Sequence, residues 1–221
     1  MQIAPKLHAF LWESTMSNNC NTYLIDGETR VLIDPGHLQL FDHVRKGLAN
    51  VELGIEDIGL VICTHAHPDH IEAVQMFKNA SVLMTLHEEE WHFIETMDHY
   101  IRASFGVGTD AIAPDFLLKE GDLSLPGLEF KVLHTPGHSP GSASIYWPGQ
   151  KVLFTGDVVF KQGIGRTDVP GGDGSLLKES IRRLSTLESE WLLSGHGEII
   201  EGGQSVKANF EHIERFWFPQ I

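Results

Sequence analysis

Apolar runs of strand length alternate with amphipathic segments along the chain. The runs cover residues 21–26, 30–34, 58–63, 82–84, 128–133, 143–147, 152–154 and 191–193. Apolar positions at helical spacing follow at 37–49, 70–78, 88–102, 175–184 and 205–217. Gly27-Glu28-Thr29 joins the first two runs as a β-hairpin, and Pro148-Gly149 joins a later pair. Strands that alternate with helices predict an α/β fold.

The pattern stops between Phe105 and Phe116, where glycines, Ile112 and Pro114 follow one another without a period. A loop of this length is typical of a lid or binding segment, and equally of an irregular surface loop. The sequence leaves both interpretations open.

Length and charge narrow the function classes. The 221 residues contain no Pro/Ser-rich linker, which predicts one domain over residues 1–221. A net charge of −14 argues against a nucleic-acid binder with a basic face. Two cysteines make neither a disulfide framework nor a thiolate zinc site. The first residues lack a signal pattern and no apolar run reaches membrane-spanning length, so we expect a cytoplasmic protein that does not contact membranes.

The most informative stretch is His65-Ala66-His67-Pro68-Asp69-His70, which follows the apolar run 58–63. Three imidazoles and a carboxylate this close together suit neither a core nor a plain surface, because each buried polar group needs a partner. Pro68 favours an extended His67 before it and a helix start after it. The motif therefore turns from strand to helix and directs its side chains in two directions. We expect it to supply ligands to two neighbouring metal ions.

Three later apolar runs also end on potential ligands, namely His138, Asp157 and His196. Glycines next to these residues allow the backbone to turn closely at the strand end. The complete donor set contains only nitrogen and oxygen, which suits zinc, manganese or iron and disfavours a purely structural zinc site. A count of 13 histidines agrees with metal chemistry.

The motif, followed in order by His138, Asp157 and His196, resembles the metallo-β-lactamase superfamily, and the early Asp34-Pro35-Gly36 agrees. The resemblance covers nearly the whole chain. It implies an αββα sandwich, in which two mixed β-sheets are flanked by helices and the metals lie at the sheet edge. It also implies that one metal is held by His65, His67 and His138, a second by Asp69, His70 and His196, and that Asp157 bridges both. Two divalent ions, zinc first with iron or manganese as alternatives, are the expected cofactors.

Within the superfamily the chain is most similar to glyoxalase II-like hydrolases, which cleave glutathione thioesters. Residues 135–141, 156–160 and 163–168 carry this similarity. It implies a small-molecule substrate, either a glutathione ester or another thiol ester, and a contact between Arg166 and a substrate carboxylate. The glyoxalase C-terminal helical domain has no counterpart beyond the predicted helix 205–217.

The implied chemistry is hydrolysis. Two cations about 3.5–4 Å apart make hydroxide available at neutral pH, and this hydroxide attacks the carbonyl group. Asp69 is a ligand and also the candidate for orienting the nucleophile. A thiolate leaving group needs little acid assistance because a thiol has a pKa of about 8.5.

The sequence leaves two alternatives to a dinuclear hydrolase. Residues 165–168 also resemble persulfide dioxygenases, which use one iron in the first site, although Gly195-His196-Gly197 resembles the dinuclear hydrolases. The second alternative is a metal-binding protein without turnover, which the complete ligand set disfavours.

Other polar and aromatic residues receive simpler interpretations. His87, His92 and His99 fall in a glutamate-rich segment and are predicted to lie on a solvated helix face. His134 is predicted to be hydrogen-bonded rather than a ligand, and Cys63 to be an inert buried thiol. Residues 210 and 216–218 supply aromatic side chains whose helical spacing favours core packing over a homodimer contact or a substrate wall.

Overall fold

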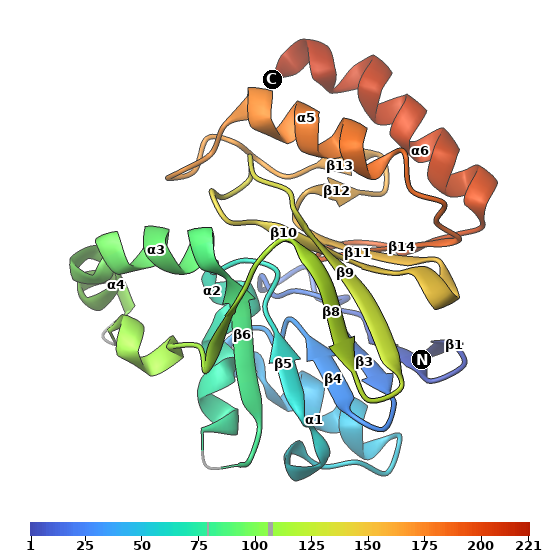
Figure 1. Cartoon of the computed structure of the whole chain (residues 1–221). Coiled ribbons are helices and arrows are strands. Elements are labelled where there is room, and N and C mark those ends of the chain that lie inside the picture. Colours follow the sequence, from blue (N-terminus) through green and yellow to red (C-terminus); the bar gives the residue numbers. More distant parts are fainter. Residues whose placement is uncertain (79, 106–107) are drawn as a thin grey trace.

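The computed structural model describes residues 1–78, 80–105 and 108–221. Its first sheet has seven strands, which lie side by side in chain order (Figure 1). The first four pair antiparallel and the last four pair parallel. These strands are β1 (Gln2–Ala4), β2 (Leu7–Phe10), β3 (Thr22–Asp26), β4 (Arg30–Ile33), β5 (Leu60–Ile62), β6 (Leu83–His87) and β7 (Phe116–Leu118).

The second sheet has six strands in the order β15-β14-β11-β10-β9-β8. Its pairs are antiparallel except for β11 with β14. The strands are β8 (Gly121–Leu125), β9 (Leu128–His134), β10 (Ala143–Trp147), β11 (Val152–Gly156), β14 (Trp191–Ser194) and β15 (Ile200–Glu201). A separate hairpin is formed by β12 (Val159–Phe160) and β13 (Gly163–Ile164).

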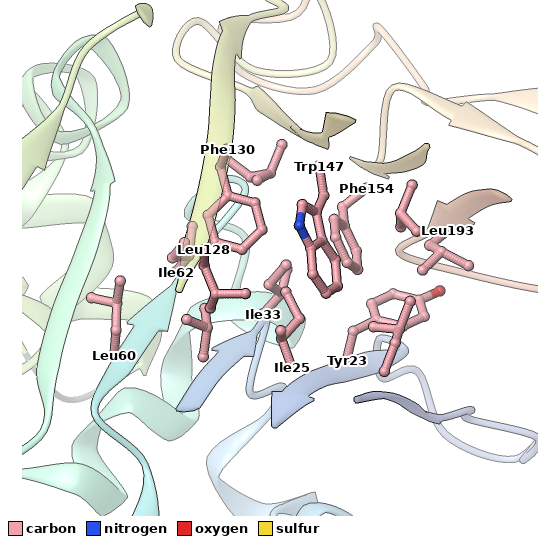
Figure 2. Close-up of a cluster of buried hydrophobic side chains, with 14 of the residues drawn as sticks. Tyr23, Ile25, Ile33, Leu60, Ile62, Leu128, Phe130, Trp147, Phe154 and Leu193 are labelled. Atoms are coloured by element: carbon pink, nitrogen blue, oxygen red, sulfur yellow. The ribbon is translucent and has the colours of Figure 1, made fainter. Parts of the chain in front are cut away.

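The two sheets pack face to face, and their alternation of side chains explains the layers. In β4, Val31 and Ile33 point into the cluster between the sheets, whereas Leu32 joins the cluster under the outer helices. Tyr23 and Phe154 meet across the inner cluster with ring centroids 5.5 Å apart (Figure 2).

Helices cover both outer faces, which completes the expected αββα sandwich (Figure 1). On the first sheet they are α1 (Asp42–Ala49), α2 (Pro68–Ile71), α3 (Glu88–Thr96) and α4 (Asp98–Phe105), and on the second α5 (Gly174–Leu184) and α6 (Gly203–Phe216). Short 3₁₀ helices are η1 (Leu38–Leu40), η2 (Ile55–Asp57), η3 (Glu72–Phe77), η4 (Thr109–Ile112), η5 (Pro148–Gln150) and η6 (Phe218–Gln220). In the described part of the chain, no helix combines the length and apolar character that a membrane crossing requires.

Several predicted elements differ from the structure. The helix expected over 88–102 is two helices, because the backbone leaves the helical region at Met97. The helix expected over 70–78 is one α-helical turn followed by η3. His87 was assigned wrongly to a solvated helix face: it ends β6, is 3% exposed, and stacks on His134 with ring centroids 4.4 Å apart.

The segment 105–116 contains η4 and leads into β7. The lid question falls partly on residues 106–107, which lie outside the described residues. The C-terminal aromatic residues divide: Phe210 and Phe218 are buried, as expected for core packing, whereas Phe216 is 48% exposed.

Candidate metal centre

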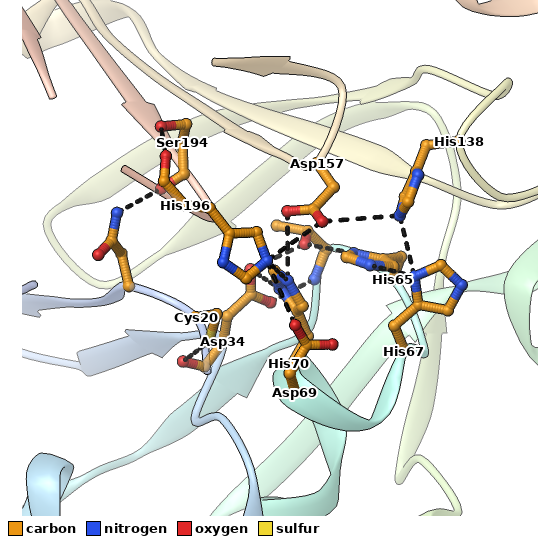
Figure 3. A network of polar contacts seen from close by, with 12 residues as sticks. Cys20, Asp34, His65, His67, Asp69, His70, His138, Asp157, Ser194 and His196 are labelled. Carbon is orange, nitrogen blue, oxygen red and sulfur yellow. Dashed lines mark hydrogen bonds and ion pairs between the residues drawn. The ribbon is translucent and has the colours of Figure 1, made fainter. Parts of the chain in front are cut away.

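The metal-binding motif begins where β5 ends, at the carboxyl edge of the parallel part of the first sheet. His67 has extended backbone angles (φ −66°, ψ 145°), and Pro68 is the first residue of α2. Because the chain turns here from strand to helix, His65 and His67 approach from the strand side and Asp69 and His70 from the helix (Figure 3). The second sheet delivers the later residues: His138 follows β9, Asp157 follows β11 and His196 follows β14.

The structure brings all seven predicted ligands together. They form three overlapping groups, and within each group the donor atoms lie within 4.8 Å of one another. The groups are His65/His67/His138, His65/His70/Asp157 and Asp69/His70/His196. In the first group, Nδ1 of His67 lies 3.1 Å from Nε2 of His65 and 2.9 Å from Nε2 of His138.

Asp157 lies between the first donor group, His65/His67/His138, and the second donor group, Asp69/His70/His196 (Figure 3). These are the two outer groups. Its Oδ2 is 3.7 Å from Nε2 of His138 and 3.3 Å from Nε2 of His196. On the other side, Oδ2 of Asp69 lies 3.3 Å from Nε2 of His196. One carboxylate therefore faces donors of both the first and the last group.

Hydrogen bonds outside the clusters orient the imidazoles. His138 donates from Nδ1 to the carbonyl oxygen of Arg166 at 2.8 Å, which leaves the Nε2 lone pair for the cluster. Nδ1 of His70 lies 2.9 Å from Oδ2 of Asp34, a buried carboxylate that also accepts from the backbone N–H and the hydroxyl of Thr64. Each of these histidines therefore turns its other ring nitrogen toward the cluster.

The two outer groups differ in protonation. Burial holds the pKa of His65 well below its ordinary value, and burial together with the neighbouring His138 lowers the pKa of His67 to about 4. Burial also disfavours a charged His196, but hydrogen bonds to Asp157 and Asp69 outweigh it and raise its pKa to about 9. His65 and His67 are thus neutral imidazoles, which is the form that binds metal.

Around Asp69, His70 and His196, protons on the histidines balance the charge of the carboxylates. Burial opposes ionisation of Asp157 and Asp69, yet the positive charge of His70 and the hydrogen bonds from His196 hold both carboxyl pKa values below the ordinary range. The pKa of His70 is raised because Asp157 and Asp34 outweigh the effect of burial. Imidazolium groups therefore neutralise these carboxylates, as a bound cation also would.

The donor set fits divalent metal ions. Oδ1 of Asp157 is buried and has no hydrogen-bond partner among the described residues, although Nε2 of His70 lies 3.2 Å away. A buried carboxylate oxygen without a partner is costly unless a ligand satisfies it. Gly195 leaves room for this arrangement, because a Cβ there would lie 2.2 Å from the same oxygen.

Arg166, the predicted substrate contact, meets the site through its backbone and not through its side chain. The Arg166 guanidinium is exposed and forms two hydrogen bonds to Asp168, at 2.8 and 3.0 Å. Only its backbone carbonyl reaches the cluster, through His138.

His134 donates from Nε2 to the carbonyl oxygen of Pro140 at 2.8 Å and belongs to none of the donor groups. Cys63 is buried, and burial raises the pKa of its thiol well above the ordinary value.

Sequence reasoning missed two carboxylates that support the site. Asp34 was used only as part of the Asp34-Pro35-Gly36 stretch that agrees with the superfamily, although it contacts Thr64 and His70. Glu90 was hidden in an acidic helix, yet it is 1% exposed and bonds to the backbone between His65 and His67. A single buried acid in an otherwise polar segment leaves no signal in the pattern of one sequence.

The family model described as the metallo-beta-lactamase superfamily matches residues 17–196. The chain belongs to the metallo-beta-lactamase superfamily. A hydroxyacylglutathione hydrolase GloC from Haemophilus influenzae is 32% identical over 203 residues, which cover 89% of this chain and 93% of that protein. A probable metallo-hydrolase from Methanocaldococcus jannaschii is 34% identical over 185 residues, covering 81% of this chain and 88% of the relative.

Solved structures of the superfamily agree with the fold. BLEG-1, described as a B3 metallo-beta-lactamase, has a TM-score of 0.74 and 33% identity, and the match covers 92% of this chain and 97% of that chain. TTHA1623, solved in a di-iron-bound form, has a TM-score of 0.70 and 32% identity, with coverage of 90% and 98%. Membership in the superfamily and the donor groups together indicate a metal-dependent hydrolase.

Proposed function

We propose that this protein is a dinuclear metal-dependent hydrolase that cleaves thioesters. The observation that carries the proposal is the position of Asp157, whose Oδ2 faces donors of both outer groups. His65, His67 and His138 would hold one ion, Asp69, His70 and His196 the other, and Asp157 both. Nitrogen and oxygen donors without thiolate favour zinc, with iron or manganese as alternatives.

Divalent ions bound there would lower the pKa of water and polarise the carbonyl group of the substrate. The residues of the chain contribute negative charge and orient the attacking nucleophile. Asp69 stays ionised, and its Oδ2 is already engaged by the side-chain amide of Asn18 at 2.6 Å. Oδ1 of Asp69 makes no hydrogen bond to the described residues. We assign this oxygen the role of accepting a hydrogen bond from the attacking nucleophile and so fixing the direction of attack.

The low pKa of a thiol leaving group supports thioesters as the substrate class. A thiol with a pKa near 8.5 leaves as thiolate at neutral pH without a general acid, whereas an amine or alkoxide needs one. Once His70 and His196 are neutral metal ligands, the described donor residues offer only carboxylates with lowered pKa values and few groups suited to protonate a leaving group. Similarity to a hydroxyacylglutathione hydrolase adds support for this class.

Metal analysis and a substrate panel test the proposal together. The protein is purified without chelator or added metal, its metals are identified and counted per chain, and thioesters, an oxygen ester, an anilide and a penicillin are assayed. Two zinc, manganese or mixed ions with turnover of thioesters alone are expected. Preferential cleavage of penicillin would reject the thioester class, and metal without any turnover would favour a binding protein.

The iron dioxygenase remains the competing function, because residues 165–168 resemble those enzymes. About one iron per chain, with oxygen uptake on addition of a persulfide, would establish it in place of the hydrolase. The complete second donor group of Asp69, His70 and His196 favours the hydrolase.

A further inference from the structure

A cavity of about 170 Å³ opens beside the first donor group. It lies where α3 and η3 approach the metal-binding motif, and its wall includes apolar side chains from several elements. Those that matter here are Ile71, Phe93, Ile94, Met97 and Ile112. His67 belongs both to this wall and to the first donor group. A group bound in the cavity would therefore lie next to a substrate carbon held at the metal centre.

The two carboxylates on the wall already have hydrogen-bond partners. Both carboxylate oxygens of Glu90 accept hydrogen bonds, one from the backbone N–H of Ala66 and one from Ser139 and Gly141. Glu72 pairs with Nδ1 of His37 at 2.9 Å. Among the described lining residues there is no lysine or arginine. Such a wall disfavours an anionic group and leaves apolar contact as its main interaction.

We propose that the cavity binds the acyl chain of the substrate, an apolar group of about six carbons. This assignment rests on the proposed thioester hydrolysis. The size follows from volume: an apolar cavity of about 150 Å³ accepts a benzene ring, which has six carbons. The acyl side is assigned because a simple acyl chain has no polar group beyond the reacting carbonyl, which matches a mainly apolar wall whose carboxylates already have partners.

The test is a chain-length series on the metal-loaded enzyme. Acetyl, butanoyl, hexanoyl and decanoyl esters of one small thiol are compared with acetyl esters of ethane-, butane- and hexanethiol. Each added methylene on the acyl side should lower KM by up to about fourfold, the fold-change that corresponds to about 0.8 kcal/mol, and the gain should end near six carbons. A fall in KM along the thiol series instead would overturn the assignment to the acyl side.

Two variants at the C-terminal end of α3 locate the effect. Met97→Trp, directly after the helix, fills the cavity and should abolish the KM difference between acetyl and hexanoyl thioesters. Glu95→Trp introduces the same side chain at an exposed position near the end of α3 and should keep that difference. Equal chain-length dependence in both variants would place the acyl chain elsewhere.

Binding of products separates this proposal from the proposed function. Calorimetric titration of the metal-loaded protein with acetate and hexanoate should show tighter binding of hexanoate, and Met97→Trp should remove the difference. If thioesters are cleaved without chain-length dependence, the cavity proposal fails and the hydrolase stands. If no thioester is cleaved but hexanoate binds selectively, the hydrolase fails and the apolar site stands. Equal binding of both acids overturns the cavity proposal.

Discussion

Oε1 of Glu90 accepts a hydrogen bond from the backbone N–H of Ala66 at 2.8 Å, at the peptide between the first two histidines of the motif. Its Oε2 accepts from the Ser139 hydroxyl and the Gly141 N–H, each at 2.8 Å, beside His138. One buried carboxylate thus connects the two loops that carry the first donor group. Burial raises the pKa of Glu90, while these three hydrogen bonds favour its ionised form.

Replacing this acid should loosen the first donor group. In Glu90→Gln an amide nitrogen replaces one acceptor oxygen and leaves buried donors facing each other, at a cost of about 1–3 kcal/mol in the free energy of unfolding. We expect affinity for the first metal to fall by about 10–100-fold, as is typical when a supporting partner is removed. Chemical denaturation and competition with a chelator measure the two effects.

Glu89→Gln is the matched control, because Glu89 is exposed on the same helix. It should change neither stability nor metal affinity by a measurable amount. If Glu90→Gln behaves like this control, the carboxylate does not hold the loops in place.

The α/β class and the candidate donors were accessible from the sequence because both depend on local spacing. The αββα sandwich and the division of the donors between two metals came from the resemblance to the superfamily. The period-two pattern around Leu32 and the ligands at strand ends follow from residues within a few positions. Asp34, His87 and Glu90 depend instead on tertiary burial of polar side chains. Each sits in a turn or an acidic segment, where the local pattern is the same for a buried and an exposed residue. The cavity follows from the break at Met97 and the packing of short 3₁₀ turns, for which a periodic pattern gives no signal.

Removing single ligands should empty the two proposed metal positions selectively. His196→Ala deletes one donor of the second group and should leave about one metal per chain. Asp157→Ala deletes a side chain that faces both outer groups and should reduce binding of both ions. Elemental analysis after dialysis against a weak chelator measures the ratio. Two tightly held ions in His196→Ala would contradict the assignment.

His92→Ala is the control for this pair, because His92 lies exposed on α3 and outside the donor groups. It removes one imidazole from the chain and should leave two metals bound. Loss of metal in this variant would mean that metal content does not report on the site.

Metal binding to the metal-free protein should release protons. The pKa of His196 is raised to about 9 and that of His70 is also raised, so both hold a proton at pH 7.5, whereas a metal ligand must be neutral. Binding affinity should therefore rise with pH below about 9, by about tenfold per pH unit for each proton released. His65 and His67 have lowered pKa values and should contribute little.

Calorimetry in two buffers with different ionisation enthalpies counts these protons at pH 7.5. The imidazoles should account for about two of the protons that the wild-type protein releases. His196→Asn is expected to lose the second metal, so His70 also keeps its proton and about two fewer should be released. A heat of binding that does not depend on the buffer would show that the imidazoles are neutral before metal arrives.

Arg166 has two separate roles in this assignment. Its backbone carbonyl orients His138, and its side chain is predicted to bind a substrate carboxylate. The carbonyl oxygen accepts from His138, and a side-chain substitution leaves that bond in place. A substrate carboxylate would have to share the guanidinium with Asp168, which is exposed and therefore exchangeable. We expect Arg166→Ala to raise KM for a carboxylate-bearing thioester by about tenfold while kcat and metal content change little, as for loss of uniform binding. A thioester without a carboxylate should show no change in KM. If KM stays the same for both substrates, the side chain takes no part in binding and the role of Arg166 is confined to its carbonyl.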